Sequence, residues 1–252
     1  MSAPVRVVKL GGSVLRSDEE VPARVDLLRR EVAAGARVVA VASAFEGATD
    51  RLWQRALRFA GRPDPERLAA LVACGEEEAT AALALVAAAG GLDVVRLAAS
   101  ELDLVTCGPA LAGAPLRLGG RRLERALGEA PLVVVPGFVG RDEDGRATLL
   151  GRGGSDSTAI FLAAALGATC RLVKDVDGWF EADPASDPAA RRYRSLHWDH
   201  AIAHPAPIVQ PEAVRLAREL GQRFEVTGVA GDPGTGVGPD PSELAPAREA
   251  VA

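Results

Sequence analysis

Residues Pro136–Ala168 read PGFVGRDEDGRATLLGRGGSDSTAIFLAAALGA, and this stretch contains the transitions that decide the fold. A polar turn with Asp-Gly at its tip separates two short apolar arms, which predicts a β-hairpin over 139–149, projecting at the edge of a site. The glycine-rich turn that follows leads into a helical pattern over 155–166, with Ser155 or Asp156 as the expected N-cap. A hairpin, a glycine turn and a helix are therefore predicted in direct succession.

The alternation of strand and helix continues in both directions from this stretch. Apolar runs bounded by glycine or proline, mostly continuous rather than alternating, predict strands that are buried on both faces. They cover 5–10, 37–44, 93–98, 131–139, 170–176 and 224–229. Segments with helical spacing lie between them, over 19–34, 49–60, 65–89, 155–166 and 211–220. This order predicts an α/β fold in which helices cover a mainly parallel sheet. The hairpin divides an N-terminal from a C-terminal half, so we expect two lobes that share one sheet, with the boundary near residue 140.

Composition excludes several classes of function. The chain has 252 residues, 48% of them apolar, which suffices for one large or two small cores. Its 29 basic and 34 acidic residues give a formal charge of −5, so neither nucleic acid nor an anionic membrane is an expected partner. The apolar stretches are all shorter than a membrane span, and the N-terminus lacks the apolar region of a signal peptide, which predicts a cytoplasmic location. Glycine, proline, aspartate and alanine dominate the end of the chain, so a flexible tail is expected over 239–252.

The three cysteines are an odd number at wide spacing, with no close pair. Cys74, Cys107 and Cys170 therefore predict reduced thiols, packed as small apolar residues, rather than a disulfide or a metal site.

The first predicted strand ends in Lys9-Leu10-Gly11-Gly12-Ser13. Ligands of open α/β sheets bind at the carboxyl ends of strands, where backbone without side chains can approach an anion. Lys9 is a fixed positive charge beside the glycines, which suits a transferring phosphoryl group. An ordinary strand-to-helix turn with an exposed lysine would look the same. The order of glycine and lysine is the reverse of a Walker A loop.

A second glycine cluster, over 150–157, opens the helix that follows the hairpin. A helix N-terminus is a second anion site, and the planar guanidinium of Arg152 matches a carboxylate. Asp156 could orient Lys9 or the first amides of the helix. The alternative is a simple glycine turn with a capping aspartate. Two such clusters in one chain, each with a cation, favour a binding site.

Five segments of the chain resemble the motifs of aspartate kinases, in the amino acid kinase family: Lys9–Ser13, Ser43–Leu52, Gly75–Leu83, Pro136–Gly167 and Lys174–Pro184. The resemblance spans residues from about 5 to 237. It implies an αβα three-layer sandwich around a mainly parallel sheet of about eight strands. It assigns the catalytic domain to 1–238, with amino-acid binding in the lobe over 1–140 and nucleotide binding over 141–238. It also implies that the protein uses ATP with Mg²⁺ to phosphorylate the side-chain carboxylate of L-aspartate, giving 4-phospho-L-aspartate. This product would be used in amino-acid biosynthesis.

The same resemblance implies roles for individual residues. Lys9 would be the transition-state cation, and Asp156 would organise the catalytic groups. The phosphate cradle would be formed by Gly11, Gly12 and Ser13. The amino acid would be bound by Thr49, Glu76, Arg152 and Ser155, with Glu76 accepting from the α-ammonium group. The nucleotide would contact Asp175, Phe180, which takes the place of the usual tyrosine, and Asp183. Since a carboxylate is already a nucleophile at neutral pH, no general base is required.

Some positions depart from the family pattern. Ala201 stands where a lysine usually contacts the ATP phosphates, and Lys174 is the predicted substitute because it leaves the sheet at the same end. Glu77 and Cys107 also differ from the residues common at their positions, which leaves the identity of the acceptor open. We interpret Glu77 and Glu78 as solvated residues on a helix face.

The three histidines have spacings that resemble a metal site on a helix. The resemblance instead implies that His204-Pro205 is structural, so no metal is predicted at His197, His200 and His204.

Aspartate kinases normally continue into two ACT domains, and nothing in 231–252 predicts one. We therefore expect a catalytic domain that either escapes control by lysine and threonine or is controlled through a separate regulatory chain or another interface. A homodimer is expected by analogy. Two alternatives stay open: a kinase of a different amino acid or small carboxylate, and a family member that binds nucleotide or amino acid without turnover.

Overall fold

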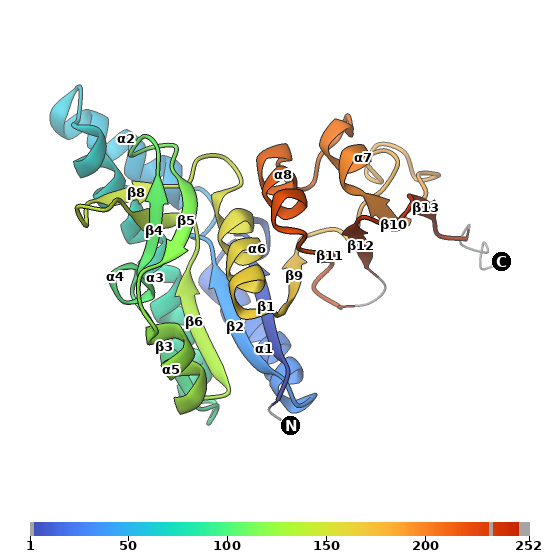
Figure 1. Ribbon diagram of the computed structural model, residues 1–252, viewed down its shortest axis with the longest axis horizontal. Coiled ribbons are helices and arrows are strands. Elements are labelled where there is room, and N and C mark those ends of the chain that lie inside the picture. Colours follow the sequence, from blue (N-terminus) through green and yellow to red (C-terminus); the bar gives the residue numbers. More distant parts are fainter. Residues whose placement is uncertain (1–2, 232–233, 247–252) are drawn as a thin grey trace.

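The centre of the fold is the first strand, β1 (Val5–Leu10), which lies between β2 (Arg37–Ala42) and β9 (Thr169–Val173) and runs parallel to both. The computed structural model describes residues 3–231 and 234–246, and within them the main sheet has nine strands in the order β13-β10-β12-β11-β9-β1-β2-β6-β3 (Figure 1). The remaining strands are β3 (Val94–Arg96), β6 (Leu132–Pro136), β10 (Tyr193–His197), β11 (Phe224–Thr227), β12 (Thr235–Gly238) and β13 (Glu243–Leu244). Among the described strands of this main sheet, only the pairs β11–β12 and β10–β13 are antiparallel. The predicted mainly parallel sheet is confirmed, with one strand more than expected.

Helices cover both faces of this sheet, because successive strand residues point to opposite sides. On one face, Val7 and Val39 belong to a core cluster that also contains residues of α5 (Arg122–Glu129), α6 (Gly154–Leu166), α7 (Trp198–Ala203) and α8 (Pro211–Leu220). Val8 and Val38 pack against α1 (Val21–Ala33) and α3 (Pro65–Ala89). In Figure 1, α6 and α1 lie on opposite sides of β1 and β2. The result is the predicted αβα sandwich.

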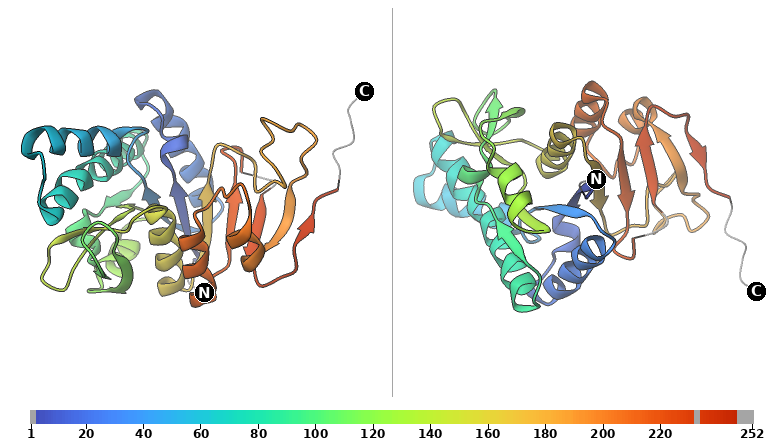
Figure 2. Two further views of the ribbon diagram at one scale, coloured as in Figure 1. Left: turned by 90° about the horizontal axis from the view of Figure 1, so that it is seen from above. Right: turned by 60° about the horizontal axis from the view of Figure 1, so that its bottom comes forward.

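A second, four-stranded sheet lies beside the first. It has the order β5-β4-β7-β8, from β4 (Leu104–Cys107), β5 (Ala114–Leu118), β7 (Val139–Arg141) and β8 (Ala147–Leu149). The last two strands form the predicted hairpin. Phe138 turns the chain from β6 into this sheet with a positive φ of 64°, a conformation that is uncommon for a residue with a side chain. The short helix α4 (Ala99–Leu102) precedes β4, and α2 (Ala48–Ala60) packs with the first half of α3 against the hairpin. Figure 2 shows this part, green to cyan, opposite the orange-to-red C-terminal strands.

The C-terminal prediction needs correction. A flexible tail was predicted from residue 239, but Glu243–Leu244 forms β13 and pairs with β10, and the Ser242 hydroxyl accepts a hydrogen bond from the His197 amide at 3.0 Å. Residues 247–252, the rest of the predicted tail, lie outside the described residues. The division into two lobes at residue 140 stays a prediction; that position falls inside β7. Within the described residues, no helix combines the length and apolar character that crossing a membrane requires.

Four parallel strands end together, and this alignment positions the site. Leu10, at the end of β1, is in register with Ala42 of β2 and Val173 of β9, and Ala42 is in register with Pro136 of β6. The segments that leave these strands therefore meet at one edge of the sheet. The glycine turn after β1, the loop after β2, the turn before the hairpin and Lys174 all begin there.

Candidate functional site

A buried carboxylate holds two ammonium groups at this edge. Asp156 lies in the first turn of α6, and its Oδ1 is 2.7 Å from the Lys9 Nζ while its Oδ2 is 2.8 Å from the Lys174 Nζ. All three residues are less than 9% exposed, at 6% for Lys9, 4% for Asp156 and 8% for Lys174. Tertiary packing of α6 against β1 brings the three groups together, although they are far apart in the sequence. The predicted pairing of Lys9 with Asp156 is therefore present, and Lys174 completes a cluster with a net positive charge.

The pKa values of this cluster follow from burial and from the ion pairs. Burial lowers the pKa of Lys9 to about 8, because the charged form loses hydration, and attraction to Asp156 opposes this effect. Burial would raise the pKa of Asp156, but the attraction of Lys174 and Lys9 outweighs it and brings the pKa to about 2. The carboxylate is thus ionised at neutral pH, and most of Lys9 is protonated.

Lysine is rare in this chain, and both lysines belong to the buried cluster. Of the 29 basic residues, Lys9 and Lys174 are the only lysines, and the other 27 (29 − 2) are arginines. Both lysines contact the same carboxylate. A guanidinium is planar and larger than an ammonium, so it does not fit a position built for a compact point charge. The count of lysines was the signal in the sequence that could have singled out this pair.

The glycine turn after β1 leaves room for Lys9. A Cβ at Gly11 would lie 2.9 Å from the Lys9 Nζ, so a side chain there would displace the ammonium group. Gly12 and Ser13 begin a short 3₁₀ helix over Gly12–Val14, and both line the cavity described below. The predicted cradle thus lies beside the predicted cation.

Glu76 brings a carboxylate to the same place from α3. It is 2% exposed, its Oε1 accepts a hydrogen bond from the Ala44 amide at 3.3 Å, and its Oε2 has no partner among the described residues. Burial raises the pKa of Glu76 to about 7, and the hydrogen bond from the Ala44 amide opposes that effect. An unpartnered buried carboxylate oxygen needs a donor, and a ligand ammonium group would supply one.

One cavity of about 700 Å³ connects these groups. Eight of the residues predicted for the site line it: Lys9, Gly12, Ser13, Thr49, Glu76, Arg152, Ser155 and Asp156. Arg152 is exposed, Ser155 is buried and Thr49 is half-buried in the first turn of α2. The two glycine clusters therefore share one cleft, which Lys9, Arg152 and Glu76 all line.

Sequence reasoning missed the apolar wall of this cavity. It is formed by Phe45, Trp53, Leu111, Phe138 and Leu149, which come from four different parts of the chain. Only Trp53 carried a usable signal, because it follows Thr49 by four residues and so lies on the same helix face.

The predicted nucleotide segment lies apart from this cavity. Phe180 lines a separate cavity of about 690 Å³, together with Pro184, residues 188–192, Ala245 and Pro246. The Asp183 carboxylate accepts hydrogen bonds within its own loop, from the Ala185 amide at 2.9 Å and the Ser186 hydroxyl at 3.2 Å. Asp175 is exposed and follows Lys174 directly. The segment therefore continues outward from the lysine cluster, and the nucleotide roles of its residues stay predictions.

Two expectations about local structure were wrong. The N-cap of α6 is Gly153, with a φ of 74° and no side-chain cap, so neither Ser155 nor Asp156 caps the helix. The Asp156 carboxylate is turned to the two lysines instead. Glu77 is not a solvated residue: it is half-buried, pairs with Arg96 and accepts a hydrogen bond from the Ala99 amide at 2.7 Å.

The three cysteines are free thiols as predicted, but the predicted apolar packing holds for only one of them. Cys170 is buried, whereas Cys74, in α3, and Cys107, the last residue of β4, are exposed.

The histidines take part in packing. The His204 ring contacts Trp179 edge-on at a centroid distance of 5.8 Å, and burial lowers the pKa of His204. His200 Nδ1 lies 3.0 Å from the Ser242 hydroxyl. In the part of the chain that the structure describes, no group of three or more His, Cys, Asp or Glu is arranged to hold a metal ion.

Comparisons with known proteins show which sequences and folds this chain resembles. The model of the amino acid kinase family matches residues 4–227. An aspartate kinase of Pseudomonas putida is 34% identical over 197 residues, which cover 78% of this chain and 48% of that protein. An aspartokinase of Bacillus sp. (strain MGA3) is 33% identical over 225 residues, covering 87% of this chain and 54% of that protein. The crystal structure of an aspartate kinase from Synechocystis is similar with a TM-score of 0.78 at 27% identity, covering 94% of this chain and 40% of that one. The chain spans about half the length of the curated relatives it matches.

Proposed function

Because this chain belongs to the amino acid kinase family, we propose that it transfers the γ-phosphoryl group of ATP to the side-chain carboxylate of L-aspartate, forming 4-phospho-L-aspartate and ADP. The observation that carries this proposal is the shared cavity: Lys9, anchored beside Lys174 by Asp156, opens into the same space as Glu76 and Arg152. The relatives named aspartate kinase support aspartate as the acceptor.

The cavity offers a partner for each charged group of aspartate. The free Oε2 of Glu76 accepts a hydrogen bond from the α-ammonium group. The planar Arg152 guanidinium binds the α-carboxylate through two parallel hydrogen bonds. The hydroxyls of Thr49 and Ser155 add hydrogen bonds. The side-chain carboxylate is then directed toward Lys9.

The chemistry requires no proton transfer. An oxygen of the aspartate side chain attacks the γ-phosphorus, the bond from that phosphorus to the β,γ-bridging oxygen breaks, and ADP leaves with the electron pair. Lys9 and the amides of Gly11, Gly12 and Ser13 neutralise the charge that spreads over the transferring group. Lys174 supplies a second positive charge beside Lys9, and we propose it as the substitute for the family lysine that Ala201 replaces.

Family membership implies ATP as the phosphoryl donor, and Mg²⁺ with it. Mg²⁺ supplies positive charge to the β- and γ-phosphates when bound. Both oxygens of Asp156 already pair with lysines, so this carboxylate does not fit a metal ligand. We place the nucleotide along the segment from Lys174 to Asp183, with Asp175 and Phe180 beside it and Asp183 keeping the loop in shape.

Two of the departures from the family pattern lie away from the acceptor. Glu77 bonds to Arg96 and to the Ala99 amide, and the Cys107 thiol lies 3.8 Å from the Ala114 carbonyl. Neither residue lines the cavity. These positions therefore give no reason to prefer another acceptor over aspartate.

A hydroxylamine assay tests the function. The protein is incubated with Mg·ATP and aspartate, glutamate or another small acid, and acyl phosphate is trapped as the hydroxamate. We expect hydroxamate with aspartate, and none from the Lys9→Ala variant, whose folding is checked by circular dichroism. Hydroxamate with a different acid alone would correct the acceptor. Nucleotide binding without hydroxamate from any acid would show a protein that binds without turnover.

Assembly, regulation and location stay proposals. A homodimer is proposed by analogy with the family. Light scattering at a micromolar protein concentration tests it, and finding monomer alone would contradict it. A separate regulatory chain and a cytoplasmic location remain predictions from the sequence.

A further inference from the structure

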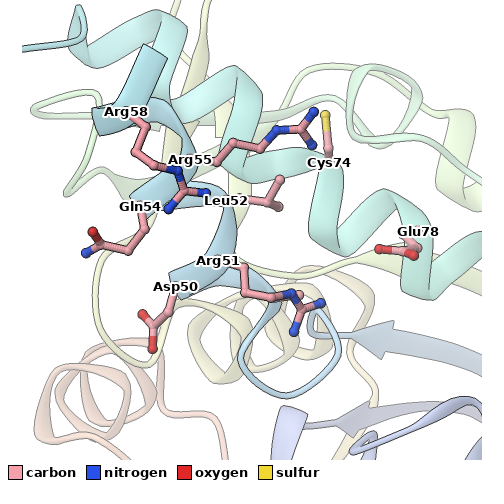
Figure 3. A pocket seen from close by; sticks show the side chains of 9 residues that line it. Asp50, Arg51, Leu52, Gln54, Arg55, Arg58, Cys74 and Glu78 are labelled. Carbon is pink, nitrogen blue, oxygen red and sulfur yellow. The ribbon is translucent and has the colours of Figure 1, made fainter. Parts of the chain in front are cut away.

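Helix α2 lines two cavities, which share Asp50 as a lining residue. Its first turn, with Thr49 and Asp50, lines the cavity of the candidate site. Its outer face lines a second cavity of about 600 Å³, together with Cys74 and Glu78 of α3 (Figure 3). The proposed function makes no use of this second cavity.

Three arginines dominate the second cavity. Arg51, Arg55 and Arg58 are spaced four and three residues apart, which puts them on one face of α2. In the view of Figure 3 their guanidinium groups lie between the Asp50 carboxylate on one side and the Glu78 carboxylate on the other.

Within the described part of the chain, none of the three arginines forms an ion pair with a carboxylate. Arg51 donates to the Glu46 carbonyl at 3.3 Å, and the Arg55 guanidinium carbon lies 5.3 Å from the centre of the Phe59 ring. Some exposed arginines elsewhere on the surface do pair with a nearby carboxylate, for example Arg67 with Asp64, Arg121 with Glu124 and Arg215 with Glu212. The cavity therefore collects three guanidinium groups whose hydrogen-bonding capacity is largely unused.

We propose that this second cavity binds a small polyanion, a molecule that carries two or more phosphate or carboxylate groups. A planar guanidinium group binds either kind of oxyanion through two parallel N–H···O hydrogen bonds. Arg51, Arg55 and Arg58 lie on successive turns of this face, so separate acidic groups of one polyanion would each meet a guanidinium group. The proposal concerns a different cavity from the candidate site and does not rest on the proposed function.

Cys74 provides a reporter within the cavity. Its thiol is exposed and lines the cavity, whereas Cys107 is exposed elsewhere, on β4, and serves as the internal control. The rates of alkylation of both thiols by iodoacetamide are measured by peptide mass spectrometry, with and without added pyrophosphate or citrate. At a probe concentration of about ten times its Kd, we expect the Cys74 rate to fall about tenfold, because only the unoccupied cavity reacts. The Cys107 rate should not change.

A pair of matched variants separates the arginine site from a general charge effect. Arg55→Gln/Arg58→Gln removes two guanidinium groups from the cavity and keeps good helix formers at exposed positions, so the fold should tolerate it. Arg30→Gln/Arg125→Gln makes the same change in charge at exposed positions of α1 and α5. We expect protection of Cys74 to be lost in the first variant and kept in the second.

A negatively charged reagent gives a test without any ligand. Iodoacetate is attracted by the guanidinium groups, so its rate at Cys74 relative to iodoacetamide should be higher in the native chain than in Arg55→Gln/Arg58→Gln. Protection by pyrophosphate alone would assign the site to phosphates, and protection by citrate alone would assign it to carboxylates. The proposal is overturned if neither probe protects Cys74 at millimolar concentration, or if protection survives in Arg55→Gln/Arg58→Gln.

Discussion

At the scale of single residues, the candidate site depends on a carboxylate that two ammonium groups share. Asp156 pairs with Lys9 and Lys174 in surroundings that exclude most water. Removing one member of a buried ion pair leaves an uncompensated charge, which costs about 3–5 kcal/mol. The cluster therefore fixes the position of Lys9 and also makes its charge sensitive to its neighbours.

The first prediction at this scale concerns pH. Glu76 must be ionised to accept from the acceptor's ammonium group, so kcat/KM for the acceptor should rise as pH increases through about 7. Lys9 must be protonated to neutralise the phosphoryl group, so kcat/KM should fall as pH rises through about 8. We expect a narrow bell-shaped profile. Glu76→Gln should remove the acid limb of the profile. Lys9→Arg should remove the alkaline limb, at a much reduced rate. If kcat/KM stays constant from below pH 7 to above pH 8, both roles are contradicted.

The second prediction concerns Lys174. Lys174→Ala should raise KM for ATP by about 10- to 100-fold, since a hydrogen bond to a charged group contributes about 1.5–3 kcal/mol. The same variant should move the alkaline limb to higher pH, because Lys174 lowers the pKa of Lys9 by repulsion. A purely structural Lys174 would leave KM for ATP unchanged in a folded variant. Lys174→Arg should recover little, because the buried position suits a compact ammonium group.

At the scale of elements, close packing of α3 against the loop after β2 places Glu76. A Cβ at Gly75 would lie 3.0 Å from the Ala44 Cβ and 3.3 Å from the Leu52 Cδ1. The Ala44 amide is also the donor to Glu76. The absence of a side chain at one helical position therefore sets both the distance between the two elements and the direction of the carboxylate.

Gly75→Ala tests this arrangement. The added methyl group must push the loop away from α3 and weaken the hydrogen bond from the Ala44 amide to the Glu76 carboxylate. We therefore expect KM for the acceptor to rise several-fold while KM for ATP changes little. Gly128→Ala is the matched control, because Gly128 lies in α5 with no atom within 4 Å of its would-be Cβ. That control should be neutral or stabilise by about 0.5–1 kcal/mol. Equal effects of the two substitutions would refute the role of close packing at Gly75.

At the scale of the whole molecule, both halves of the chain build one cavity. Lys9 and Glu76 come from the first half, and Arg152 and Asp156 from the second. The halves are joined through a continuous sheet in which β9 of the second half pairs with β1 of the first. A ligand in the cavity therefore bridges segments that unfolding would separate.

This arrangement predicts strong linkage between substrate and stability. Mg·ATP at about 100 times its Kd should raise the free energy of unfolding by about 2.7 kcal/mol, measured by chemical denaturation. Lys9→Ala should show a much smaller increase at the same ATP concentration. Identical stabilisation of both proteins would mean that the nucleotide binds elsewhere.

Much of the fold could be predicted from the sequence, because local patterns were strong. The helices over Pro65–Ala89 and Pro211–Leu220 match their predicted bounds, and both begin with proline, which favours a helix start. Short strands such as β12 and β13 were missed, since a few residues with glycine and proline carry no clear periodicity. The predicted cap of α6 was wrong because the helix begins earlier in the chain, after Gly153 with its positive φ, which puts Ser155 and Asp156 inside the first turn.

The sequence by itself determined the parallel sheet, the two glycine clusters and the chemical types of the site residues, because continuous apolar runs and glycine turns act over a few neighbouring positions. Only the tertiary structure decided that both lysines share Asp156, that Glu76 keeps a free oxygen within reach of the same cavity, and that three arginines of α2 face a separate one. Those facts depend on which strands align in register and which helix faces are buried, and such long-range geometry is set by the packing of the whole chain.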